Sequence, residues 1–279
     1  MISTAIYILI FSALLAAVAS ILARVLLKDI PVKKILAVNF LIMAATLLVF
    51  SPLFYKFDFS LENIGLVFLI AVIDTLANYF YFKTFEKTEA SIAIPILSLA
   101  PIITFLFSAI FLSEFPSISS VFFSLIIIIL IIVVSTDLKD LKKFSRATLY
   151  PALISSFLFG ISAIPSKYLL STLHATNAPT LYMIRAALIS IFALFIFKDS
   201  FSPLNIKTYR IIFLRGLFVI GQWILLYYAL TLGSTGVAVT LGNITPVFVV
   251  ILSFIFLREK PTIKKVLASV LILVASFFI

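Results

Sequence analysis

The chain contains one apolar stretch twice: residues 91–118 read SIAIPILSLAPIITFLFSAIFLSEFPSI, and residues 236–263 read GVAVTLGNITPVFVVILSFIFLREKPTI. The two stretches align without a gap. Apolar matches alone carry little weight in so hydrophobic a chain, but Pro101 aligns with Pro246 and Glu114 with Glu259 in the same register. Self-similarity at a fixed spacing is typical of internal duplication. We therefore interpret the chain as two copies of one half.

The composition places both halves in a membrane. Of the 279 residues, 63% are hydrophobic and 11% are charged, and the mean hydropathy is +1.29. Soluble domains are about half apolar and about a quarter charged. The values exclude a soluble enzyme, a disordered protein and a nucleic-acid binder. The net charge of +10 instead fits cationic loops beside anionic lipid.

The apolar segments predict an all-α polytopic membrane protein with ten transmembrane helices, since a span needs about 20 mainly apolar residues. The predicted helices lie near Ser3–Ala23, Ile35–Tyr55, Ile64–Phe82, Ala90–Leu112, Ser117–Ser135, Tyr150–Leu170, Pro179–Phe197, Ile206–Leu226, Thr235–Leu257 and Ile263–Ile279. They divide into a first five-helix repeat over residues 1–136, a basic linker over 137–149 and a second five-helix repeat over 150–279.

The loop charges indicate that the two repeats are inverted. Because five is odd, the second copy enters the membrane with the opposite orientation. Of the 21 Lys and Arg residues, 17 lie after odd-numbered segments, whereas the loops after even-numbered segments carry only Lys56 and Lys167. The positive-inside rule then places the odd loops in the cytoplasm and both termini outside. We predict a multi-pass protein of the plasma (inner) membrane.

These features resemble the EamA-like family of the drug/metabolite transporter superfamily. Each half ends its fourth helix with a P-x12-E-x-P motif, and residues 227–238, YYALTLGSTGVA, lead into the ninth helix. The resemblance implies a secondary active transporter, an exporter or exchanger of small metabolites such as amino acids. It also implies alternating access about a midplane cavity lined by helices 3, 4, 8 and 9. It further implies cytoplasmic termini, which the loop charges contradict.

Asp74 is the strongest candidate for a functional charge, because it lies in the middle of a predicted helix. Asn78 and Tyr81 follow on the same helical face. A cavity-facing acid could bind a cationic group or carry a proton, and intramembrane ions are functional by default. The alternative is a structural partner for Arg185 or Arg215. Arg185 itself could bind a substrate carboxylate, pair with Asp74 or extend to the interface, whereas Arg215 is expected to snorkel.

Four further residues complete the predicted substrate site. Asn243 belongs to a small, polar stripe on the ninth helix, and Ser98 belongs to the equivalent stripe on the fourth. Such stripes can pack helices closely or line a substrate path. Trp223 and Tyr227 share one face of the eighth helix and could form an aromatic cavity wall. Glu114 and Glu259 lie at helix ends, where we expect them to brace the turns that follow.

A membrane-embedded protein that handles lipids or isoprenoids, as a flippase or an enzyme, is the alternative function. Such an enzyme needs clustered acid–base or metal-binding groups. The chain has no Cys, one His and no HExxH, GxSxG or P-loop motif, so we predict no enzyme, no cofactor and no metal. The predicted partners are a small-molecule substrate and membrane lipid, with Asp74 as a candidate for proton coupling. The sequence specifies neither the substrate nor the oligomeric state.

Overall fold

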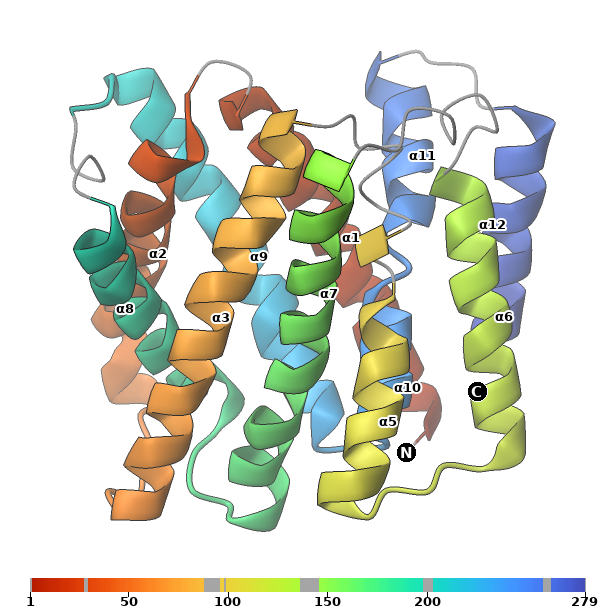
Figure 1. Cartoon of the computed structure of the whole chain (residues 1–279), viewed down its shortest axis with the longest axis horizontal. Helices are drawn as coiled ribbons and strands as arrows, with labels where there is room; N and C mark the ends of the chain where they lie inside the picture. The colour runs from red at the N-terminus through yellow and green to blue at the C-terminus, as the bar shows by residue number, and fades with distance from the viewer. Residues whose placement is uncertain are drawn as a thin grey trace.

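The computed structural model describes residues 2–27, 30–87, 96–97, 99–135, 146–197, 203–257 and 262–278. These residues form a bundle of helices that run in both directions along one axis (Figure 1). The elements are α1 (Ile2–Leu27), α2 (Val32–Phe50), η1 (Ser51–Leu53), α3 (Leu61–Lys87), α5 (Ala100–Leu112), α6 (Ile118–Ser135), α7 (Arg146–Lys167), η3 (Tyr168–Thr172), α8 (Ala178–Ile196), α9 (Ile206–Leu230), α10 (Thr235–Gly242), α11 (Thr245–Leu257) and α12 (Ile263–Ser276). The predicted all-α class is confirmed. Within the described ranges, β pairing is limited to an isolated bridge between Phe57 and Thr176.

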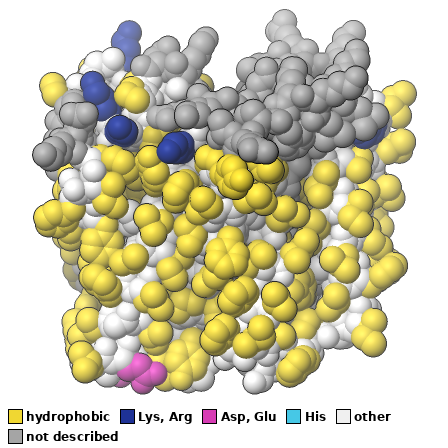
Figure 2. Space-filling view, in the orientation of Figure 1, with side chains coloured by type: hydrophobic (Ala, Val, Ile, Leu, Met, Phe, Trp, Pro, Cys, Tyr) yellow, Lys and Arg dark blue, Asp and Glu magenta, His cyan; other side chains and the backbone are white. Residues whose placement is uncertain are grey.

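Seven candidate spans are long and apolar enough to cross a membrane. They are Thr4–Leu27, Val32–Leu53, Leu61–Thr84, Leu149–Thr172, Ala178–Ile196, Ile206–Leu230 and Thr235–Leu252, with two shorter apolar helices at Ala100–Leu112 and Ile118–Val134. Apolar side chains cover the face seen in Figure 2. Because lipid-facing helices must expose such side chains, the chain is a multi-pass membrane protein.

The predicted span Thr235–Leu257 is not one continuous helix. It consists of α10 and α11, separated at residues 243–244. Pro246 has no backbone N–H, and Val247 N bonds to Ile244 O at 3.0 Å in a tight turn at the start of α11. The Asn243 amide donates to Val239 O at 2.8 Å. The proline therefore breaks the helix, and the asparagine side chain satisfies a backbone acceptor beside the break.

The contacts between helices follow the twofold repeat. α1 packs on α9, and α3 packs on α7; α2 packs on α8, α5 on α10, and α6 on α12. If α1 is equivalent to α7 and α3 to α9, exchange of the halves converts the first two pairs into each other. It leaves the α2–α8 and α6–α12 pairs unchanged, and the α5–α10 pair also joins one half to the other. In Figure 1, α1 begins at the lower end of the bundle and α7 at the upper end. The two halves are thus interleaved rather than side by side.

The two ends of the bundle differ in charge. Lys and Arg side chains gather along the upper edge in Figure 2, and an acidic side chain lies at the lower edge. Both chain termini are marked in the lower half of Figure 1. We call the upper end the basic end and the lower end the terminal end.

Gly160 allows α5 and α7 to approach closely. A Cβ at this position would lie 2.7 Å from the Ile103 Cβ and 2.8 Å from the Ala100 carbonyl oxygen. The Thr104 hydroxyl donates to Gly160 O at 3.0 Å across the same contact. Small residues let membrane helices pack backbone to backbone in this way.

Gly160→Ala is therefore expected to destabilise the fold by about 1–3 kcal/mol, because a backbone oxygen cannot move aside. Gly65→Ala is the matched control, since a Cβ on Gly65 meets no atom within 4 Å. The control should be neutral or stabilising by about 0.5–1 kcal/mol. Thermal unfolding of both variants in detergent measures the difference. Equal melting temperatures would show that the close approach is not required.

Candidate functional site

A cavity of about 420 Å³ lies between the two halves of the bundle. Its wall includes residues of α1, α2 and α3 from the first half and of α7, α9, α10 and α11 from the second. It extends from Leu27, the last residue of α1, to Leu230, the last residue of α9, and these residues mark opposite ends of the bundle. A concave, mainly apolar space with a few polar groups is the usual form of a small-molecule site.

Five of the predicted substrate-binding residues line this cavity: Asn78, Tyr81, Trp223, Tyr227 and Asn243. They come from three separate parts of the chain, α3, α9 and the break between α10 and α11. Ser98 lies outside the described residues. Asp74 and Arg185 do not belong to the cavity wall and lie behind it.

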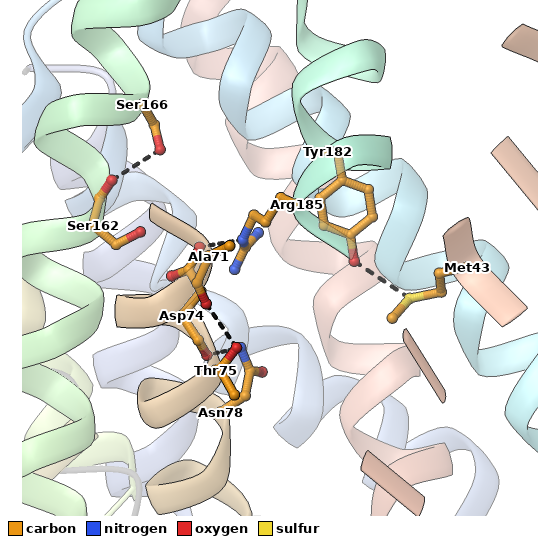
Figure 3. Close-up of polar contacts among 9 residues, drawn as sticks. All are labelled: Met43, Ala71, Asp74, Thr75, Asn78, Ser162, Ser166, Tyr182 and Arg185. Carbon is orange, nitrogen blue, oxygen red and sulfur yellow. Dashed lines mark hydrogen bonds and ion pairs between the residues drawn. The ribbon is translucent and has the colours of Figure 1, made fainter. Parts of the chain in front are cut away.

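Asp74 and Arg185 form a buried ion pair, the structural alternative that the sequence left open. Both residues are fully buried, and the Arg185 Nε–H donates to Asp74 Oδ2. Figure 3 shows the carboxylate on α3 and the guanidinium on α8 pointing toward each other. The Asn78 amide donates to the Asp74 backbone oxygen at 2.8 Å. The acid is thus neutralised by a specific partner, and the cavity wall begins one helical turn away.

Three aromatic rings surround the Arg185 guanidinium. Its central carbon lies 3.9 Å from the Trp223 ring centroid, 5.5 Å from that of Tyr182 and 5.9 Å from that of Tyr227. Trp223 and Tyr182 stack with their ring planes 11° apart. Cation–π contacts of this kind stabilise a desolvated arginine. The ion pair therefore fixes the rings that face the cavity.

The sequence reasoning missed Tyr182, although a signal was present. Tyr182 precedes Arg185 by three residues, so the two share a face of α8. Its hydroxyl donates to the Met43 sulfur at 3.3 Å (Figure 3). This contact ties α8 to α2.

The prediction that Arg215 extends to the membrane interface is wrong. Only 8% of its surface is exposed, and the side chain lines the cavity. Its Nη1 donates to the Asn39 Oδ1 at 2.6 Å, and its guanidinium lies 5.5 Å from the Phe82 ring centroid. The expectation failed because the sequence does not show that Asn39 of α2 and the cavity lie beside Arg215, so that the guanidinium is held inside the bundle. The sequence analysis did not predict Asn39 as a site residue. Its sequence context gives no indication of this role beyond an amide side chain in an apolar segment.

A group of contacts around Glu114 joins the two halves of the chain, and its Lys167 directly follows Ser166 of the cavity wall. The Glu114 carboxylate pairs with the Lys167 Nζ at 2.8 Å and accepts hydrogen bonds from Thr235 N at 2.7 Å and Thr235 Oγ1 at 3.0 Å. Lys167 also donates to the Gly233 carbonyl oxygen. We call these four residues the Glu114 cluster.

The observed contacts of Glu114 differ from the role that the sequence predicted, which was to brace the turn that follows it. Glu114 caps the first turn of α10, in the other half of the chain, rather than its own turn. A carboxylate is favourable there because the N-terminal N–H groups of a helix carry partial positive charge. The equivalent Glu259 lies outside the described residues.

Within the described ranges, His, Cys, Asp and Glu side chains form no group that could hold a metal ion. The polar groups of the described cavity wall are amides, hydroxyls and one guanidinium, beside several aromatic rings. Such groups can bind a solute reversibly.

Comparison with known proteins agrees with this arrangement. A solved structure titled "Crystal structure of protein" matches with a TM-score of 0.74 and 16% identity, over 99% of this chain and 96% of that chain, which shows a shared fold. No protein of curated function matches the chain. A model of the EamA-like transporter family matches twice, over residues 3–136 and 148–279. The family expected from the sequence is thus confirmed: the chain belongs to the EamA-like transporter family.

Proposed function

We propose that the chain is a secondary active transporter that carries small metabolites by alternating access about the central cavity. The observation that carries this proposal is a cavity lined by both interleaved halves. We infer that the Glu114 cluster, an ion pair and hydrogen bonds between the halves next to that wall, closes one end of it. A carrier needs a closure that can break and re-form, and hydrogen bonds with an ion pair can do so more readily than a packed apolar core. Lipid handling by a flippase or an enzyme is less favoured, because the family consists of transporters.

We further propose that the chain has ten transmembrane helices in two inverted five-helix repeats, with α10 and α11 as one interrupted span. The repeat boundaries at residues 1–136 and 150–279 agree closely with the two family matches. The gathering of Lys and Arg at one end supports a cytoplasmic basic end and outer termini. We propose that this carrier lies in the plasma membrane and exports or exchanges its solute.

Asp74 is assigned a structural role in this proposal, through its pair with Arg185. Transport would then be driven by an ion gradient that does not act through Asp74, or by the gradient of the solute itself. The pair holds α3 against α8 and positions the ring of Trp223 at the cavity wall.

The ion pair between Asp74 and Arg185 predicts how single and double variants differ in stability and transport. Asp74→Asn and Arg185→Gln should each destabilise the protein by about 3–5 kcal/mol, because each leaves a buried charge unpaired, and both should impair transport. The double variant should recover most of the melting temperature, since no buried charge remains. Thermal unfolding and solute uptake into proteoliposomes measure both effects. Normal solute uptake by Asp74→Asn would show that Asp74 has no part in transport. A double variant that is stable but whose uptake no longer depends on a proton gradient would instead assign Asp74 to proton coupling.

The Glu114 cluster predicts how access to the cavity is controlled. Glu114→Gln removes the ion pair with Lys167, so conformations open at the terminal end should become more populated, by roughly tenfold. The chain has no Cys, so a single Ser166→Cys in the cavity wall reports access to an impermeant maleimide. Labelling should become faster from the terminal side, as measured in right-side-out and inside-out vesicles.

Glu62→Gln is the matched control for this experiment. Glu62 is an exposed carboxylate in the first turn of α3, at the same end of the bundle. Its loss should leave the labelling rate unchanged. Equal rates in the two glutamine variants would contradict a role for the Glu114 cluster in access.

The predicted orientation, with the basic end in the cytoplasm, can be tested by labelling introduced cysteines. Thr172 and Lys207 are both exposed, near the terminal and basic ends respectively. In intact cells, an impermeant maleimide should react with Thr172→Cys, whereas Lys207→Cys should react only after the cells are permeabilised. The reverse pattern would place both termini in the cytoplasm.

A further inference from the structure

The charges around the cavity are unbalanced. Asp74 and Arg185 neutralise each other behind the wall, so neither presents a net charge to the cavity. Arg215 is the one charged side chain among the described lining residues, and no carboxylate of a described residue pairs with it. The described part of the cavity wall is therefore net positive.

Arg215 and Asn39 present hydrogen-bond donors that lack acceptors. The bond from Arg215 Nη1 to Asn39 Oδ1 at 2.6 Å turns the amide oxygen toward the guanidinium. Arg215 Nε and Asn39 Nδ2 then have no hydrogen-bond partner, although both residues are more than nine-tenths buried and line the cavity. Both groups are donors only. A ligand that satisfies them must supply acceptor atoms.

An unpaired guanidinium at membrane depth is costly, and a bound anion offsets that cost. A carboxylate matches the geometry, because its two oxygens can accept from neighbouring donors at once. Farther along α9, Trp223 and Phe159 form an apolar wall with ring centroids 6.4 Å apart. Trp223 follows Arg215 by eight residues, which is about 12 Å of helix rise. The cavity thus has one donor-rich region and one aromatic region.

We propose that Arg215 and Asn39 form an oxyanion-binding site and that the transported solutes are small organic monoanions, with a carboxylate at this site and an apolar or aromatic body toward Trp223. This inference rests on the proposed transport function and narrows it to a substrate class. A monoanion fits better than a zwitterion, because the described wall offers no carboxylate to an ammonium group.

The first test uses Trp223, which is the chain's single tryptophan and therefore the sole source of its tryptophan fluorescence. In purified protein, quenching by iodide, an anion, is compared with quenching by neutral acrylamide. Arg215→Gln should lower the iodide quenching constant several-fold and leave the acrylamide constant unchanged. Arg210→Gln, an exposed arginine on the same helix, should behave like wild type.

Arg215→Lys keeps the inference testable if the glutamine variant folds poorly. The lysine retains the positive charge, so iodide quenching should return toward the wild-type constant. Iodide quenching that is the same in Arg215→Gln, Arg215→Lys and wild type, with acrylamide quenching intact, would overturn the anion site.

The second test compares 4-phenylbutyrate with its neutral carboxamide as probes for thermal stabilisation. A ligand that binds only the folded protein raises its melting temperature. The carboxylate should stabilise wild type and Arg210→Gln, and Arg215→Gln should weaken its apparent affinity by roughly tenfold, as expected for one charge-assisted hydrogen bond. Equal stabilisation by both probes, or by neither, would overturn the proposed substrate class. Solute uptake sensitive to Glu114→Gln would still support a carrier in that case, so the two proposals can fail separately.

Discussion

The exclusion of water from the membrane interior is the constraint on which this structure depends. Every charge at membrane depth needs a partner, because lipid offers none. Asp74 finds that partner in Arg185, and the aromatic rings of Tyr182, Trp223 and Tyr227 cover the guanidinium. The ion pair thus sets the position of α3 against α8 and of the rings that face the cavity. Among the described residues, the hydrogen-bond partner of Arg215 is a neutral amide, that of Asn39. We propose that this difference makes Arg185 a structural arginine and Arg215 a binding one.

Duplication supplies the second constraint. The first and third helices of each half pair across the repeat, so neither half encloses the cavity alone. Interleaving brings Asn243, at the break between α10 and α11, into the same cavity wall as Asn78 of α3. The Glu114 cluster uses the same interleaving, because Glu114 of the first half caps a helix of the second. The Glu114 cluster is therefore a contact between halves, as the proposed alternating access requires.

Much of the candidate site could be predicted from the sequence, but the roles within it could not. Helical periodicity grouped Asn78 with Tyr81 and Trp223 with Tyr227, and all four residues line the cavity. The same periodicity grouped Asp74 with Asn78, yet the Asp74 side chain turns behind the wall toward α8. Periodicity assigns a residue to a face of a helix, and it does not say which neighbouring helix covers that face.

The sequence by itself determined the membrane class, the duplication and the family, because hydropathy, a repeated register of Pro and Glu, and loop charge are properties of the linear chain. Only the tertiary structure decided which charges are paired. Asp74 and Arg185 are 111 residues apart, and Asn39 and Arg215 are 176 apart. Arginine has the same chemistry at either position. Its function depends on whether folding brings a carboxylate or an amide to it, and that depends on how the two halves interleave.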